Sequence, residues 1–220
     1  MNNKVLVLAK WARQYTGIYS LAILALALSS GAAWAEDQII GDADAGKSKA
    51  VTCSACHGAG GNSVNPQWPS LAGQHANYLT STLNAFKSGD RSDVLMGSQA
   101  TILSDQDIAD LAAYFASQAA TKRTANPSLA AQGERIYRGG DKEASVSACI
   151  ACHGPTGRGN APAGYPSLTS QHAAYTAKQL NDYKNEKRVS DGDTQMMRSI
   201  AARLSKDQID AVAAYIQGLR

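Results

Sequence analysis

Two short segments hold the residues with the clearest capacity for chemistry. Residues 53–57 (CSACH) and 149–153 (CIACH) share the pattern C-x-x-C-H, and together they use all four cysteines of the chain. In this pattern two thiols bond to one haem edge, and the histidine that follows offers a neutral imidazole to the iron. The sequence therefore predicts two c-type haems. Their predicted attachment and iron-binding residues are Cys53, Cys56 and His57 for the first haem, and Cys149, Cys152 and His153 for the second.

Two other uses of paired cysteines have to be weighed against haem attachment. A C-x-x-C pair can form a redox disulfide, but this gives no reason for a histidine directly after each pair. Two such pairs can also close one zinc site. Each pair instead opens its own copy of a longer repeat, which favours two separate haem sites.

The N-terminal 35 residues have the pattern of a secretory signal peptide. Lys4, Lys10 and Arg13 form a basic start, residues 18–28 are apolar, and Ala33-Trp34-Ala35 is an A-x-A cleavage sequence. We expect cleavage after Ala35 and export to the periplasm, the kind of compartment in which c-type haem is attached. The run from residue 14 to 35 carries no charge, so peripheral membrane association through an uncleaved segment stays possible.

The charge of the chain changes once this segment is set aside. The full sequence has 21 basic and 18 acidic residues, and three of the basic residues lie in the predicted signal peptide. The remaining charges balance, which excludes the basic surface of a nucleic-acid-binding protein. Residues 36–125 carry nine acidic and six basic side chains, whereas residues 126–220 carry nine acidic and twelve basic ones.

The chain beyond residue 35 is an internal duplication. The C-x-x-C-H segments are 96 residues apart, the segments Pro-Ser-Leu and Gln-His that follow are 97 apart, and the final Leu-Ser and Ala-Ala-Tyr segments are 101 apart. Insertions in loops explain the drift. We predict domains at residues 36–122 and 131–220 with a linker at 123–130. A covalently held haem supplies the apolar centre that such short domains need.

Helical patterns dominate both copies, so we expect an all-α fold. Ser104 with Asp107, and Ser205 with Gln208, have the spacing of capping boxes before helices with one apolar face. Asn126-Pro127 is a favourable start for the helix that opens the second copy. A further helix is predicted from about residue 74 to 87 and from 171 to 184. Glycine and proline between these helices indicate loops.

With these motifs in place, the two copies resemble class I cytochrome c domains, and the whole of residues 36–220 resembles the di-haem cytochrome c4 family. The resemblance implies that each iron is held by the motif histidine and a downstream methionine. Met96 is the sole methionine of the first copy after residue 35, and the second copy offers Met196 and Met197. Met197 lies at the same distance from its final helix as Met96, so Met96 and Met197 are the expected ligands.

The resemblance also implies supporting roles for other residues. The carbonyl groups of Pro69 and Pro166 are expected to accept the other ring proton of each histidine ligand. Gly46 and Gly133 are expected to face Tyr114 and Tyr215 where the first and last helices of each copy cross. His75 and His172 are rival iron ligands, although a surface or capping role is favoured for both. For Arg91 and Arg188 a solvated position is favoured over pairing with haem propionates.

An iron held by His and Met has no open position, so the resemblance implies electron transfer without a small-molecule substrate. The expected partners are redox proteins: a quinol-oxidising complex of the bc1 type (quinol–cytochrome c reductase) and a terminal cytochrome c oxidase. Two alternatives stay open, a di-haem peroxidase and the cytochrome subunit of a periplasmic dehydrogenase.

Overall fold

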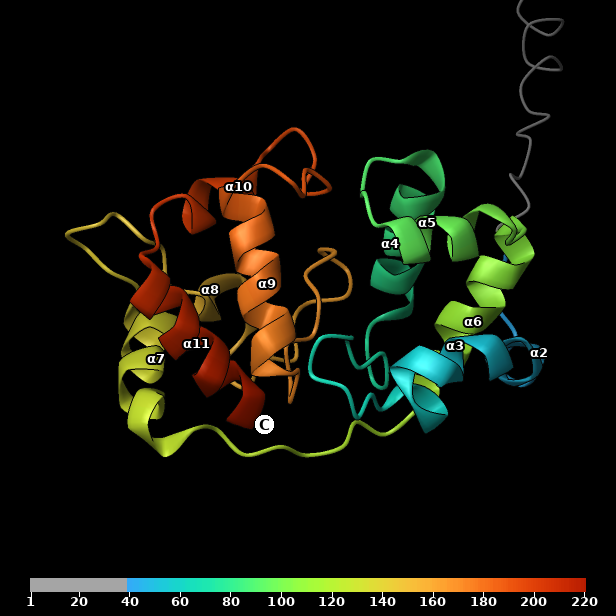
Figure 1. The fold of residues 1–220 in the computed structure, drawn as a ribbon, viewed down its shortest axis with the longest axis horizontal. Helices are drawn as coiled ribbons and strands as arrows, with labels where there is room; N and C mark the ends of the chain where they lie inside the picture. The colour runs from blue at the N-terminus through green and yellow to red at the C-terminus, as the bar shows by residue number, and fades with distance from the viewer. Residues whose placement is uncertain (1–38) are drawn as a thin grey trace, which may run out of the picture. The chain divides into compact units, whose positions relative to one another are not determined.

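A computed structural model of the protein describes residues 39–220, and its helices repeat in the order that the duplication predicts (Figure 1). The predicted signal peptide and its cleavage site lie outside the described residues. The first half, residues 39–125, contains α2 (Ala43–Lys49), α3 (Val51–His57), the 3-10 turn η1 (Ala59–Gly61), α4 (Ala76–Ser88), α5 (Val94–Thr101) and α6 (Asp105–Ser117). The second half, residues 126–220, contains α7 (Pro127–Gly139), α8 (Ile150–His153), α9 (Ala173–Lys184), α10 (Met196–Ala201) and α11 (Lys206–Gly218).

The described residues form helices and loops, with isolated β-bridges but no strand. The expected all-α fold is confirmed. Each helix within residues 39–220 is too short or too polar to cross a membrane.

The predicted helix starts are confirmed by their capping geometry. The hydroxyl groups of Ser104 and Ser205 each accept a hydrogen bond from the backbone amide three residues on. The side-chain oxygens of Asp107 and Gln208 accept one from the backbone amide of the capping serine. The Asn126 side chain caps α7, whose first residue is proline. Each capping box satisfies two backbone donors that the first turn leaves unpaired. These caps fix where the last helix of each half begins.

Two glycines let the first and last helices of each half cross closely. A Cβ atom at Gly46 of α2 would lie 2.8 Å from Tyr114 Cβ on α6, and it would overlap the carbonyl oxygen of Asp110. At Gly133 of α7 the corresponding distance to Tyr215 Cβ of α11 is 2.6 Å. No side chain fits at either crossing. The predicted pairing of each glycine with its tyrosine is confirmed.

The remaining helices pack around these crossings. Helix α4 lies against α5 and α6, and α9 lies against α10 and α11 (Figure 1). Both α4 and α9 begin two residues later than predicted, because His75 and His172 are extended N-cap residues. The methionine-bearing helices α5 and α10 are thereby held beside the long helices of their own halves.

The two halves contact each other through a reciprocal pair of glutamines. Gln171 accepts a hydrogen bond from Ser70 N (2.9 Å) and donates one to Ser70 O (2.9 Å). Gln74 makes the same two bonds to Ser167, at 2.8 and 2.9 Å. Since both serines belong to the repeated Pro-Ser-Leu segment, each half uses the same surface toward the other.

Arg123, in the segment between α6 and α7, joins the same interface. Its guanidinium donates to the carbonyl oxygens of Ser63 in the first half and Ser170 in the second, both at 2.7 Å. The guanidinium thereby bridges the two halves next to the glutamine pair. The domain boundaries predicted from sequence remain a prediction, although α7 begins at Pro127, inside the predicted linker.

Candidate haem-binding site

A cavity of about 1700 Å³ runs through the described part of the chain. All eight residues predicted to hold two haems line it: Cys53, Cys56, His57, Met96, Cys149, Cys152, His153 and Met197. Four come from each half. The structure therefore places both predicted sets of haem-binding residues in the lining of one cavity.

In the first half, His57 is the last residue of α3 and is 6% exposed. Its Nδ1 lies 2.9 Å from the carbonyl oxygen of Pro69. A carbonyl only accepts, so Nδ1 carries the proton and Nε2 keeps its lone pair. Burial lowers the pKa of His57, against a smaller raising effect of the Pro69 carbonyl. The ring is thus held neutral, with Nε2 available as an iron ligand.

The second half repeats this arrangement. His153 ends α8, is 7% exposed, and places Nδ1 3.0 Å from the carbonyl oxygen of Pro166. Burial again lowers the pKa of the histidine, opposed by the proline carbonyl. Both predicted proline contacts are confirmed. Such a partner fixes the tautomer and the orientation of a metal-binding imidazole.

The two cysteine pairs lie in separate halves, and neither pair is joined by a disulfide in the described part of the chain. Burial is the main reason that the pKa of Cys53 is raised, and it raises the pKa of Cys149 to about 11. A thiol held neutral in this way is unlike the thiolate of a redox-active C-x-x-C pair. The observation favours haem attachment over the disulfide alternative.

The two expected methionine ligands are presented by short helices. Met96 lies in the first turn of α5, where the Asp93 carboxylate accepts hydrogen bonds from the backbone of Leu95 and Met96. Met197 packs against the buried core of the second half, whereas Met196 is 36% exposed. The difference supports Met197 over its neighbour.

The wall between these residues is apolar. Leu79, Phe86 and Phe115 line the cavity in the first half, and Leu180, Leu204 and Ile216 line it in the second. Paired thiols, a neutral imidazole and a thioether in each half form a donor set that suits c-type haem iron. The residues present therefore fit two such groups.

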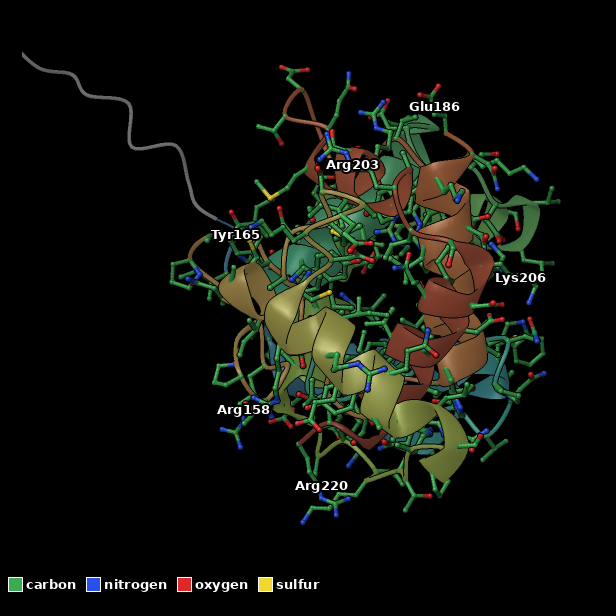
Figure 2. The ribbon with its side chains drawn as sticks, turned by 90° about the vertical axis from the view of Figure 1, so that its left-hand side faces the viewer. Arg158, Tyr165, Glu186, Arg203, Lys206 and Arg220 are labelled. Atoms are coloured by element: carbon green, nitrogen blue, oxygen red, sulfur yellow. The ribbon has the colours of Figure 1, made fainter. Side chains whose placement is uncertain are left out.

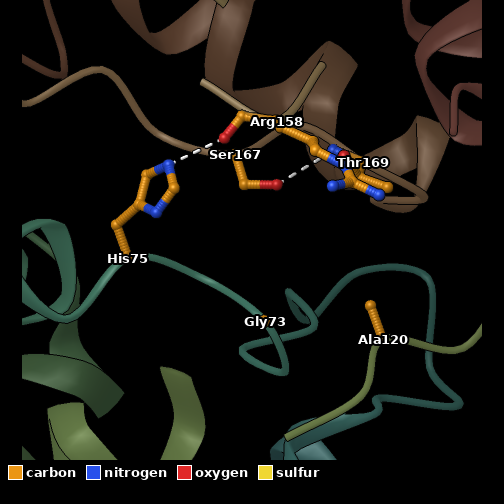
Figure 3. A pocket seen from close by; sticks show the side chains of 6 residues that line it. All are labelled: Gly73, His75, Ala120, Arg158, Ser167 and Thr169. Atoms are coloured by element: carbon orange, nitrogen blue, oxygen red, sulfur yellow. Dashed lines mark hydrogen bonds between the residues drawn. The ribbon is translucent and has the colours of Figure 1, made fainter. Parts of the chain in front are cut away.

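The rival histidines lie elsewhere. His75 and His172 do not line the large cavity. His75 Nε2 donates to the carbonyl oxygen of Arg158 at 2.7 Å, beside a smaller cavity of about 250 Å³ (Figure 3). His172 is 8% exposed, and its Nε2 lies 2.9 Å from Ser63 O and 3.0 Å from the guanidinium of Arg123. Both histidines occupy the N-cap position of their helix, as the capping alternative predicts, although the contact between the halves buries His172 and rules out a surface position for it.

The favoured prediction for Arg91 and Arg188 is also wrong. These arginines are 8% and 6% exposed, and both line the large cavity. Arg91 is buried because it reaches Tyr175 and Gln179 of the second half. Arg188 is buried because it reaches Tyr78 of the first half and Gln179 of its own half. Sequence reasoning also missed Gln179, which contacts both arginines. No repeat marks this residue, because the corresponding position of the first half is Thr82.

Comparisons with known proteins agree with this site. The family model described as "Cytochrome c" matches residues 43–119 and 130–220. Cytochrome c4 of Pseudomonas aeruginosa is 52% identical over 179 residues, which cover 81% of this chain and 89% of that protein. The crystal structure of reduced recombinant cytochrome c4 from Pseudomonas stutzeri is 48% identical, with a TM-score of 0.80, and covers 82% of this chain and 100% of that chain.

A relative that is not named cytochrome c4 is also similar to this chain. The "Thiosulfate dehydrogenase electron acceptor" of Thiomonas intermedia is 36% identical over 173 residues, which cover 76% of this chain and 78% of that protein. The cytochrome c4 relatives are electron-transfer proteins and not enzymes, so the peroxidase alternative is set aside. The chain belongs to the cytochrome c4 family of electron-transfer proteins, and its two C-x-x-C-H domains carry two covalently bound haem c groups.

Proposed function

We propose that this protein is a periplasmic carrier that takes electrons from a quinol-oxidising complex of the bc1 type and passes them to a terminal oxidase. His57 with Met96, and His153 with Met197, are the proposed iron ligands. Cys53, Cys56, Cys149 and Cys152 are the proposed attachment points. The observation that carries the proposal is the single cavity wall that unites these eight residues across both halves.

The haems supply reversible one-electron chemistry, and the chain supplies its setting. Burial keeps each imidazole neutral. The carbonyl oxygens of Pro69 and Pro166 fix its orientation, so the ligand would stay in place during electron uptake and release. The thioethers of Met96 and Met197 favour a high reduction potential. The apolar wall excludes water. With a histidine and a methionine as ligands of each iron, no ligand position would be left for a substrate, which suits a carrier.

The location follows from residues 1–35, whose pattern predicts export and cleavage after Ala35. Mass spectrometry of the protein purified from the periplasmic fraction tests this part. A mature chain that begins at Glu36 supports it. A protein recovered with an intact N-terminus in the membrane fraction contradicts it and supports anchoring instead.

Electron transfer with purified membrane complexes tests the proposed partners. The oxidised protein should be reduced by the bc1-type complex with quinol, and the reduced protein should be oxidised by the terminal oxidase. Both rates should be sufficient to sustain quinol oxidation when the three components are combined. A protein that exchanges electrons with neither complex would contradict this assignment.

The similarity to the thiosulfate dehydrogenase electron acceptor favours a second candidate partner. In this alternative the protein accepts electrons from a periplasmic dehydrogenase and itself catalyses nothing. Reduction by thiosulfate dehydrogenase and thiosulfate, faster than reduction by the bc1-type complex, would select it.

A further inference from the structure

The two methionine-bearing helices begin in different ways. In the first half, the Asp93 carboxylate caps α5 and accepts hydrogen bonds from the backbone amides of Leu95 and Met96. In the second half, α10 begins after Gln195, whose side chain makes no capping hydrogen bond to the described helix and whose backbone is left-handed, with φ of 48°. A residue other than glycine keeps this strained conformation only where its surroundings impose it. The start of α10 therefore needs support from another part of the chain.

The loop before α10 is longer than its counterpart in the first half. In the repeat Met197 corresponds to Met96, and Thr194 takes the place of Asp93. Between the buried arginine of each half and its methionine there are four more residues in the second half than in the first. This longer loop contains Asp191. The second half thus lacks the capping aspartate but has a carboxylate further upstream.

Asp191 binds Arg198, the residue that directly follows Met197 in α10. Its Oδ2 accepts a hydrogen bond from Arg198 N at 2.9 Å, and its Oδ1 accepts one from Arg198 Nε at 2.7 Å. Arg198 Nη2 also donates to the carbonyl oxygen of Gly192 at 3.1 Å. The backbone and the side chain of one helical residue are therefore both tied to the same loop.

The burial of this ion pair makes it a strong constraint. The side chains of Asp191 and Arg198 are 5% and 17% exposed. Removing one partner of a buried pair leaves the other charge uncompensated, which is strongly destabilising. The pair of Lys206 and Asp210 on α11 is far more exposed and contributes little.

The constraint acts on the backbone of Met197 itself. The amide nitrogen of Arg198 and the carbonyl group of Met197 belong to one planar peptide group. A hydrogen bond that fixes this nitrogen therefore also fixes the direction in which Met197 leaves the helix. Met197 and Asp191 line the same large cavity, and Met197 packs against the buried core of the second half.

We propose that Asp191 and Arg198 are positioning residues that hold Met197 at the iron of the second haem, as the Asp93 cap holds Met96 in the first half. The inference rests on the proposed iron ligation by Met197. Groups around a metal ligand orient it and tune how firmly it binds. Without the ion pair the bond between sulfur and iron should break more often, and an external ligand can then enter.

The binding of imidazole to the oxidised holoprotein tests this proposal, because imidazole enters only after the methionine has left. Asp191→Asn should raise the rate at the second haem by about tenfold or more and leave the rate at the first haem unchanged. Met96→Leu and Met197→Leu identify which kinetic phase belongs to which haem. The methionine-to-iron charge-transfer band of the second haem should also be lost at a lower temperature.

Two variants of Arg198 give an answer even if Asp191→Asn does not accumulate. Arg198→Met removes the ion pair but keeps the backbone hydrogen bond, so it should also raise the rate at the second haem. Arg198→Lys keeps the charge and should restore a rate near that of the wild type. A residue that served only the general stability of the second half would not show this selective change in ligand exchange.

Two matched controls separate positioning from a general change in charge. Asp210→Asn removes the same charge from the exposed pair of the same half and should leave both rates unchanged. Asp93→Ala removes the cap of α5 and should raise the rate at the first haem only.

The proposal is overturned if Asp191→Asn and Arg198→Met leave the rate at the second haem unchanged, or if they raise the rates at both haems equally. Failure of the proposed ligation is distinguishable, because Met197→Leu would then keep both contributions to the charge-transfer band. Failure of the proposed partners appears only in the rates of electron transfer with membrane complexes.

Discussion

The two halves cross their first and last helices at equivalent glycines but stabilise the crossings differently. In the first half, Lys49 Nζ lies 2.6 Å from carboxylate oxygens of both Asp107 and Asp110. The repeat places Ile136, Gln208 and Ala211 at the equivalent positions of the second half. Ile136 and Ala211 belong to its buried core. One crossing uses charges, and the other uses apolar contacts.

The buried cores of the two halves also differ, and the second half again has more apolar contacts. The buried cluster of the first half consists of Ala50, Leu79, Leu111, Ala112 and Phe115, whereas that of the second half has ten residues. Tyr137, fully buried, occupies the position equivalent to Ala50, and its hydroxyl donates to Gly154 O at 2.6 Å. The comparison shows that the glycine crossing and the caps define the fold, while the packing around them is free to vary.

The largest expected difference between the two halves is in their resistance to proteolysis after loss of haem. In Cys53→Ser/Cys56→Ser the first half should lose its haem and, with its smaller apolar cluster, its resistance to proteolysis. In Cys149→Ser/Cys152→Ser the second half should lose its haem but remain partly resistant, because its larger cluster persists. Limited proteolysis with mass spectrometry of the fragments measures this. Equal resistance of the two haem-free halves would contradict the comparison.

The charged crossing should make the first half more sensitive to acid. Hydrogen bonds from the Asp42 amide and then from Lys49 lower the pKa of Asp110 from 3.8 to about 2. A carboxyl group whose pKa is lowered by folding stabilises the folded state at pH values above its ordinary pKa. This stabilisation is lost as the pH falls from about 4 toward 2. Asp110→Asn should lower the thermal midpoint of the first half by a few degrees at neutral pH and weaken this acid dependence.

The matched control for Asp110→Asn is Asp210→Asn in the second half, where the exposed pair with Lys206 contributes little. Hydrogen exchange of the two halves between pH 2 and pH 7 reports each separately. If Asp110→Asn and Asp210→Asn change the acid sensitivity of their halves equally, the charged crossing is not the source of the difference in acid sensitivity between the halves.

The smallest expected difference is in reduction potential. Residues 126–220 have three more basic than acidic residues, and residues 36–125 have three fewer. Figure 2 shows Lys206 and Arg220 pointing outward from the second half, and Arg203 of the same half is exposed. Its haem should therefore have the higher potential, and the difference should shrink as salt screens charges beyond about 8–10 Å. Redox titrations at low and high salt, with Met96→Leu and Met197→Leu identifying each haem, measure the order. A higher first-half potential would contradict it.

The same surface should guide docking. A basic second half favours an acidic redox partner, and association should slow as ionic strength rises. Arg203→Glu and Lys206→Glu together should reduce the association rate with such a partner, whereas Asp44→Asn in the first half should have little effect. Stopped-flow measurements over a range of salt concentrations test this.

Much of this molecule follows from local patterns in the sequence. The C-x-x-C-H segments and the capping boxes at Ser104 and Ser205 each depend on neighbours in the chain or on the repeat, whereas the glycine crossings are predicted from the family resemblance. The contact between the halves does not follow from such patterns, because a repeated Gln74 or His172 says nothing about which surface it meets. Arg91 and Arg188 resemble solvated charges until the opposite half covers them.

Other features lie outside the repeat altogether. Gln179 replaces a threonine, and the segment 138–147 has no equivalent in the first half. In the structure this segment turns at Asp141–Val146, places Val146 in the core and accepts a hydrogen bond from Gln208 at 2.6 Å. It extends the apolar cluster of the second half, a role that no short-range pattern encodes.

The visible and near-infrared spectrum of the purified oxidised protein tests the central claim, that both haems have His and Met ligands, most directly. The wild type should contain two haems per chain and show the methionine-to-iron charge-transfer band. Met96→Leu and Met197→Leu should each remove one of two similar contributions to the band, and Met196→Leu should remove neither. A wild-type protein without the band, or a loss in Met196→Leu that Met197→Leu does not show, would contradict the assignment.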